Sequence, residues 1–155
     1  MRQFLTALLT GLLFSGPALA DRPEAGAILG FSHMSNGGYS TGGWSLGLRG
    51  GYRIKGGLTP EGMLSTHSWS GGSQVLLGGG ARYYFVKAKE TIQPFALAHL
   101  QLATKTPSAL GLLIGGGAQY RINKDFFAEG LASYHLTLGN ALNIMTIGVG
   151  GGMKF

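Results

Sequence analysis

The chain has 155 residues, of which 29 are Gly and none is Cys, and 45 % are hydrophobic while only 12 % are charged, with a formal net charge of +6. The absence of Cys excludes a disulfide scaffold and any thiolate nucleophile or metal ligand. The low charge, together with a mean hydropathy of +0.19, is the opposite of a disordered chain, and Gly does not recur at every third residue as a collagen requires.

Residues 1–20 have the pattern of a secretory signal peptide. A short basic start with Arg2 precedes an apolar stretch over 4–14, and Ala18-Leu19-Ala20 matches the small-residue site at which such signals are cleaved. The weaker alternative is a membrane anchor, because the apolar stretch is shorter than the roughly 20 residues of a spanning helix. We expect cleavage to leave residues 21–155 as a single domain.

No segment after residue 20 is long and apolar enough for a transmembrane helix, so the sequence predicts none there. An exported, apolar and Gly-rich chain without such a helix indicates a membrane-spanning β-barrel, because closing a sheet on itself satisfies every backbone hydrogen bond inside the membrane.

Hydrophobic residues alternate with polar or small residues along most of the chain. In 44–54, for example, Trp44, Leu46 and Leu48 fall on one face, and Arg49 and Arg53 on the other. The segments that we expect to form strands are 25–34, 42–54, 58–68, 73–85, 91–102, 109–122, 126–137 and 144–155. Since a tilted strand crosses a membrane in about 9–11 residues, the sequence predicts an eight-stranded antiparallel up-and-down transmembrane β-barrel over 21–155.

Triple glycines recur inside three of these segments, at 78–80, 115–117 and 150–152. Glycine inside a strand permits the bends and close approaches that a tightly curved sheet requires. The alternative of a phosphate-binding loop needs a helix after the glycines, and no helical period follows them.

The connections between the expected strands fall into two sets. Those at 55–57, 86–90 and 123–125 carry Lys55, Lys87, Lys89 and Lys124, whereas those at 35–41, 69–72, 103–108 and 138–143 hold only Lys105. An even number of strands places both termini on the same side, which in outer-membrane barrels is the periplasm. We therefore expect the lysine-bearing set to face the periplasm.

Aromatic residues of the lipid-facing parity collect near the expected strand ends, where membrane barrels carry two aromatic girdles. The predicted girdle residues are Phe31, Trp44, Tyr52, Tyr83, Phe85, Tyr120, Phe126 and Tyr134.

The opposite parity predicts the residues of the barrel interior, and an eight-stranded barrel is just wide enough for side chains to fill it. The polar network expected there is Arg49, Arg53, Arg82, Arg121, Glu61, Glu129, His99 and His135. The favoured interpretation is a packed plug of ion pairs. A narrow anion conduit, and a channel for small hydrophobic ligands lined by residues such as Leu76 and Leu97, stay open as alternatives.

The whole pattern resembles the small eight-stranded outer-membrane barrels of the OmpA, OmpX and OmpW type. In that class the last strand ends in an aromatic residue that the barrel-assembly machinery reads, and here the strand ends at Phe155, although Met153 replaces the second aromatic. The resemblance implies outer-membrane lipid and lipopolysaccharide as surroundings, the assembly machinery as a partner, and a monomer that is structural or passively permeable to solutes. The short connections depart from long-looped relatives.

Catalysis is the main alternative function. His33-Met34-Ser35-Asn36 resembles the His-x-Ser-Asn motif of outer-membrane lipid A deacylases, but it lies in the first strand rather than in the last part of the barrel. A Ser35→Ala variant that leaves the lipid acyl pattern unchanged would eliminate this reading. We expect no enzyme activity, no cofactor, no metal site and no nucleic-acid partner. A soluble exported β-barrel binder is a further alternative.

Overall fold

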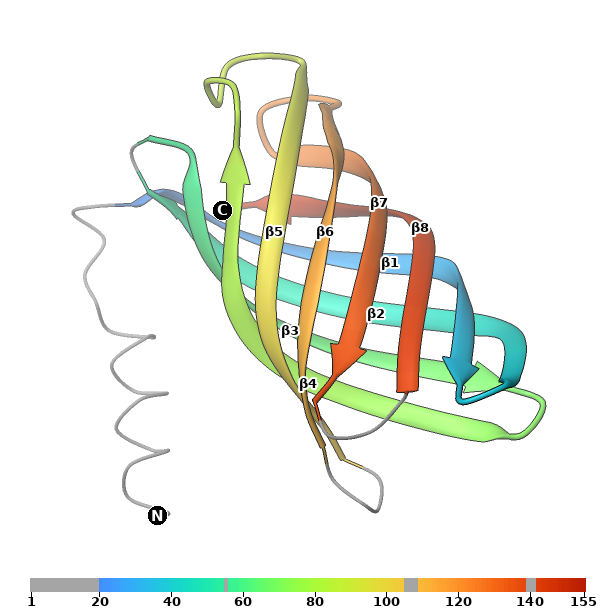
Figure 1. The fold of residues 1–155 in the computed structure, drawn as a ribbon. Coiled ribbons are helices and arrows are strands. Elements are labelled where there is room, and N and C mark those ends of the chain that lie inside the picture. Colours follow the sequence, from blue (N-terminus) through green and yellow to red (C-terminus); the bar gives the residue numbers. More distant parts are fainter. Residues whose placement is uncertain (1–19, 55, 105–108, 139–141) are drawn as a thin grey trace.

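The chain closes on itself as a barrel. The computed structural model describes residues 20–54, 56–104, 109–138 and 142–155, so nearly all of the predicted signal peptide lies outside the described residues. The strands are β1 (Ala20–Asn36), β2 (Tyr39–Ile54), β3 (Leu58–Trp69), β4 (Gly72–Tyr84), β5 (Ile92–Ala103), β6 (Ala109–Arg121), β7 (Phe126–Thr137) and β8 (Leu142–Lys154). Each pairs antiparallel with the next, and β8 pairs with β1 (Figure 1). The predicted eight-stranded barrel is confirmed.

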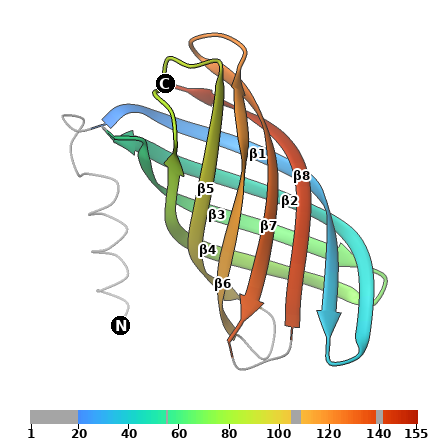
Figure 2. The ribbon, with the colours of Figure 1, turned by 45° about the horizontal axis from the view of Figure 1, so that its top comes forward.

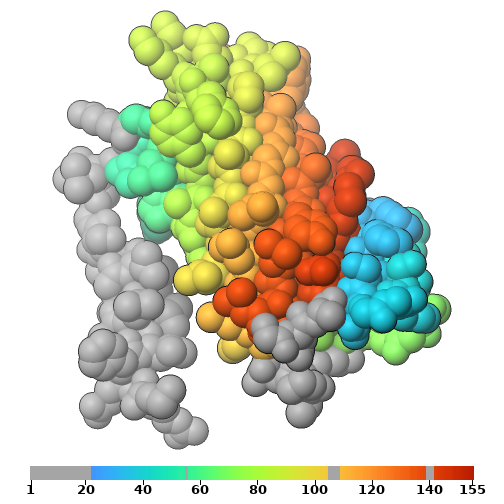
Figure 3. Space-filling view, in the orientation of Figure 1, coloured from blue at the N-terminus to red at the C-terminus, as the bar shows by residue number. Residues whose placement is uncertain are grey.

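The strands are strongly tilted, and those of one wall cross those of the other at a steep angle (Figure 2). Along the side shown in Figure 3, the residues of β4 to β8 pack edge to edge as a continuous wall. The described residues contain no helix long and apolar enough to cross a membrane.

The first hairpin is longer than the sequence predicts. Strand β1 begins at Ala20 and continues to Asn36, which pairs with Tyr39, so the connection expected over 35–41 shrinks to Gly37 and Gly38. Both glycines have positive φ, 52° and 116°, which is the geometry of a two-residue hairpin turn. The polar residues around this turn belong to the ladder and not to a loop. The other expected segments match their strands to within a few residues.

Outside the triple glycines of β4, β6 and β8, burial alternates along the strands, as the period-two pattern predicts. In β5, successive residues from Ile92 to Ala103 alternate between exposed and buried without a break. The exposed set is apolar, with Trp44 68 %, Leu100 57 % and Val149 71 % accessible, while the buried set holds Arg, Glu, Gln and His. A protein that is apolar outside and polar inside is built for a hydrocarbon surrounding.

The triple glycines serve two different surfaces. A Cβ on Gly80 would overlap the carbonyl oxygen of Ala98 on β5, whereas a Cβ on its neighbour Gly79 would meet nothing nearer than the Glu61 carbonyl oxygen at 3.7 Å. Gly80 therefore permits the close approach of two strongly bent strands, while Gly79 lies on the open outer wall.

Candidate functional site in the barrel interior

Arg49 of β2 joins three buried carboxylates inside the barrel. Its guanidinium donates from Nε to Glu129 Oε1 at 2.8 Å and from Nη2 to Glu129 Oε2 at 3.0 Å, a bidentate pair with β7. The Nη1 atom donates to Glu24 Oε1 at 2.8 Å and to Glu61 Oε2 at 3.4 Å. One side chain thus ties β1, β2, β3 and β7 together across the barrel axis.

Arg82 of β4 binds two of the same carboxylates. Its Nη1 donates to Glu129 Oε2 at 2.6 Å, and its Nε lies 3.3 Å from Glu61 Oε2. His99 Nε2 of β5 lies 3.0 Å from Glu61 Oε1, although the ring is not aligned for a hydrogen bond. We call Glu24, Arg49, Glu61, Arg82, His99 and Glu129 the ion-pair cluster; all six are at most 5 % exposed.

Sequence reasoning missed Glu24, because the first strand was expected to begin one residue later, at 25. Glu24 accepts a second hydrogen bond, from Tyr84 Oη at 3.1 Å, and Tyr84 Oη in turn accepts one from Gln119 Nε2 at 3.1 Å. With Glu24 included, the cluster holds three carboxylates and two guanidiniums, not the excess of Arg that the predicted residues imply. Extending the period-two alternation of the expected strand by one residue toward the N-terminus would have found it, because Glu24 shares the parity of the buried Ile28.

Arg53 belongs to the interior but not to the ion-pair cluster. It hydrogen-bonds the side chain of Gln93 and donates from Nη2 to the Val86 carbonyl oxygen at 3.1 Å. Gln93 donates to the carbonyl oxygens of Ala88 at 2.8 Å and Glu90 at 2.7 Å. Together Arg53 and Gln93 hold the β4–β5 turn (residues 85–91) across the end of the barrel.

Aromatic rings complete the packing around the arginines. The Arg82 guanidinium lies 4.0 Å from the centroid of the Phe95 ring, and the Arg53 guanidinium lies 4.0 Å from that of Tyr84. Such cation–π contacts stabilise a cation that has lost its water. Tyr84 and Phe95 also pack with Leu97, Leu113 and other apolar residues in one buried cluster, so leucines that could have lined a channel instead fill space.

Two predicted interior residues lie apart from the ion-pair cluster. Arg121, the last residue of β6, is only half-buried at the end of the barrel. His135 is 1 % exposed near the other end of the barrel, and neither ring nitrogen has a hydrogen-bond partner in the described part of the chain. Within that same part, no three His, Cys, Asp or Glu side chains are grouped as metal ligands.

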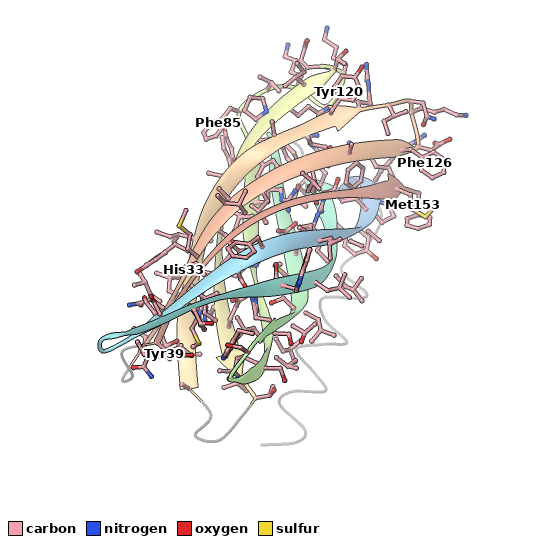
Figure 4. The ribbon with its side chains drawn as sticks, turned by 90° about the vertical axis from the view of Figure 1, so that its right-hand side faces the viewer. His33, Tyr39, Phe85, Tyr120, Phe126 and Met153 are labelled. Carbon is pink, nitrogen blue, oxygen red and sulfur yellow. The ribbon has the colours of Figure 1, made fainter. Side chains whose placement is uncertain are left out.

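The predicted girdle residues all lie exposed on the outer wall. They range from Tyr134 at 39 % to Trp44 at 68 % accessible. Figure 4 places Phe85, Tyr120 and Phe126 at one end of the barrel, together with Met153. Phe155 is 63 % exposed, and its backbone N–H donates to the Pro23 carbonyl oxygen at 3.0 Å.

His33 lies exposed on the outer wall toward the opposite end (Figure 4), and Ser35, two residues further along β1, is half-buried. A catalytic Ser–His pair needs an acid or another group to orient the imidazole. The chain has six Asp and Glu in all, namely Asp21, Glu24, Glu61, Glu90, Asp125 and Glu129. Three of them are in the ion-pair cluster. Asp21 lies at the start of β1, and Glu90 and Asp125 lie in the turns at that same end of the barrel, whereas His33 is near the other end of β1.

Comparison with known proteins gives the fold but no function. No protein-family model and no curated protein matches the chain. Among solved structures, the Neisserial surface protein A (NspA) is similar with a TM-score of 0.75 and 17 % identity, covering 86 % of this chain and 97 % of NspA. The fold is that of the small eight-stranded outer-membrane barrels.

Two further structures bracket the functions that this fold carries. The outer membrane protein OprG of Pseudomonas aeruginosa has a TM-score of 0.61 at 14 % identity, covering 85 % of this chain and 95 % of OprG. The outer membrane enzyme PagL has a TM-score of 0.52 at 17 % identity, covering 85 % of this chain and 99 % of PagL. Since a fold hosts many functions, the residues of this barrel must decide between them.

Proposed function

We propose that this chain is a closed, non-enzymatic barrel of the outer membrane that has a structural role and conducts no solute. The observation that carries the proposal is the ion-pair cluster, in which six charged or titratable side chains from six strands meet on the axis. An open channel needs a continuous water-filled path along the axis. Here the carboxylates are hydrogen-bonded to arginines and so are not available to bind a permeating ion.

The lipid surroundings and the assembly route are part of the same proposal. The exposed apolar wall supports a position among lipid and lipopolysaccharide acyl chains, and the outward Met153 and Phe155 support recognition by the assembly machinery. The barrel is proposed to be a monomer with the termini in the periplasm. An enzyme of the PagL kind is disfavoured because His33 and Ser35 have no carboxylate at their end of the barrel.

Single-channel recording in a planar bilayer tests the closed interior. We expect the purified, folded protein to give no steady current steps, and a general porin purified in the same detergent serves as the positive control. Steady steps whose size scales with salt concentration would show that the cluster leaves an open path, and the structural role would have to be replaced by a transport role.

A further inference from the structure

The charged residues of the described chain are unevenly distributed along the barrel axis. We call the end that carries both termini and the turns 85–91 and 122–125 the terminal end. Its basic residues are Arg22, Arg53, Lys87, Lys89, Arg121, Lys124 and Lys154, and its acidic residues outside the ion-pair cluster are Asp21, Glu90 and Asp125. Seven against three leaves an excess of four positive charges. At the opposite end, the described turns hold no charged residue.

These basic groups surround the mouth of the barrel. Arg22, Lys87, Lys89 and Lys124 are exposed. Arg121 and Lys154 are half-buried on the interior-facing side of the last residues of β6 and β8, and Lys154 Nζ lies 5.7 Å from the centroid of the interior ring of Phe127. Lipid headgroups encircle the outer wall, whereas groups at the mouth face the aqueous phase along the axis.

The turn that presents two of the lysines is held in a fixed conformation. Gln93, which is fully buried, donates to the carbonyl oxygens of Ala88 and Glu90, and the Glu90 N–H donates to the Lys87 carbonyl oxygen at 3.1 Å. Arg53 adds its hydrogen bond to Val86. A preordered turn loses little conformational freedom on binding, so its charges are available at low entropic cost.

We propose that the terminal end is a docking surface for a carboxylate-bearing polymer of the periplasm that approaches along the barrel axis. This inference rests on the proposed orientation of the barrel. The accessible basic groups come from β1, β6, β8 and two turns, and this spread fits a flexible chain with many charges better than one small anion. Lysine ammonium groups act as point charges that accept carboxylates without a fixed geometry, and the charge excess attracts such a chain over about 8 Å at physiological salt.

Fluorescence anisotropy with labelled poly-L-glutamate tests this surface, using the full folded protein in an uncharged detergent. We expect saturable binding that weakens as salt is raised. The triple variant Lys87→Gln, Lys89→Gln and Lys124→Gln removes three exposed positive charges and is expected to weaken binding about tenfold. Its matched control is Asn36→Asp, Ser40→Asp and Ser70→Asp, which changes the net charge equally at exposed positions of the opposite end and should leave the affinity within about twofold.

Gln93→Ala separates order from charge. It removes the two hydrogen bonds that Gln93 donates to the turn 85–91 without altering any charge, so we expect a smaller but measurable loss of affinity, with folding checked by the gel shift between boiled and unboiled protein. Equal losses of affinity in the triple lysine variant and in its control would overturn the proposal, as would no binding of poly-L-glutamate. Binding of soluble short-chain phosphatidylglycerol alone would assign the surface to lipid headgroups instead. Because binding in detergent depends neither on orientation nor on conductance, these outcomes are independent of the proposed function.

Discussion

Arg49 shows how several charged side chains can be buried together inside the barrel, because each is paired with a group of opposite charge. Removing a charge from water costs several kcal/mol unless its partners are well placed, and Arg49 has a hydrogen bond to a carboxylate oxygen from each of its three nitrogens. Loss of this one side chain would leave Glu24 and Glu129 with fewer partners and no access to water. The stability of the interior therefore depends strongly on it.

Replacing Arg49 by Met should destabilise the folded barrel by about 3–5 kcal/mol, the usual cost of removing one partner of a buried ion pair. Urea unfolding in lipid vesicles, followed by tryptophan fluorescence, measures this change. Arg22→Met is the matched control, since it removes an arginine whose ion pair with Asp125, at 3.2 Å, is about half exposed. The control should cost less than about 1 kcal/mol. Similar values for the two variants would mean that the cluster contributes no more than a surface pair.

The sequence predicts which residues face inward, but not which of them touch. Parity places Arg49, Arg82, Glu61 and Glu129 on the interior face, and the structure brings these together. Which glutamate each arginine meets depends on the stagger of the strands around the barrel, and alternation alone does not encode that stagger. Parity alone also does not separate His135 from the cluster, but its position six residues from Glu129 along β7 does.

At the scale of a strand, β4 contains three consecutive glycines, and because successive residues of a strand face opposite sides of the sheet, Gly79 and Gly80 face different surroundings. Gly80 faces the interior side, where the β5 backbone leaves no room for a side chain, while a Cβ on Gly79 would make only an ordinary contact with the Glu61 carbonyl oxygen. Composition alone shows only that glycine is abundant. The alternation of the strand shows where its absence of a side chain is required.

Gly80→Ala should therefore impair folding, whereas Gly79→Ala should be tolerated. A methyl group on Gly80 would overlap the Ala98 carbonyl oxygen and the His99 side chain, forcing β4 and β5 apart. The fraction of each variant that refolds into detergent micelles, read from the gel shift between boiled and unboiled samples, gives the measurement. Normal refolding of Gly80→Ala would show that β5 moves aside easily and that the close packing of these strands is not a constraint.

Strand positions were predictable because each strand is long enough to show several cycles of alternation, and because Gly, Asn and Lys interrupt it at the turns. The failure at the first hairpin has a physical cause. Its ladder continues through Ser35, Asn36, Ser40 and Thr41, which are polar because this part of the hairpin extends toward the aqueous end of the barrel. A run of polar residues therefore indicates the end of a strand only within the membrane. Where a hairpin extends beyond the membrane into water, its paired residues can be polar as well.

For the whole molecule, the charge asymmetry and the even strand count together predict one orientation, with the terminal end in the periplasm. The absence of Cys makes this directly testable with single-cysteine variants. Ser40 and Ala88 are both exposed and lie at opposite ends, and the side chain of Ala88 makes no part of the Gln93 hydrogen bond to its backbone. We expect a membrane-impermeant maleimide to label Ser40→Cys on intact cells, and Ala88→Cys only after the outer membrane is permeabilised.

The labelling also tests the membrane assignment itself, because a soluble exported barrel would leave both cysteines in the periplasm. In that case neither variant would react on intact cells, and both would react equally after permeabilisation. If Ala88→Cys but not Ser40→Cys were labelled on intact cells, the orientation would be the reverse of the proposed one, with the terminal end outside the cell. Only labelling of Ser40→Cys on intact cells, with Ala88→Cys labelled after permeabilisation, agrees with an apolar wall that spans the membrane and a terminal end that faces the periplasm.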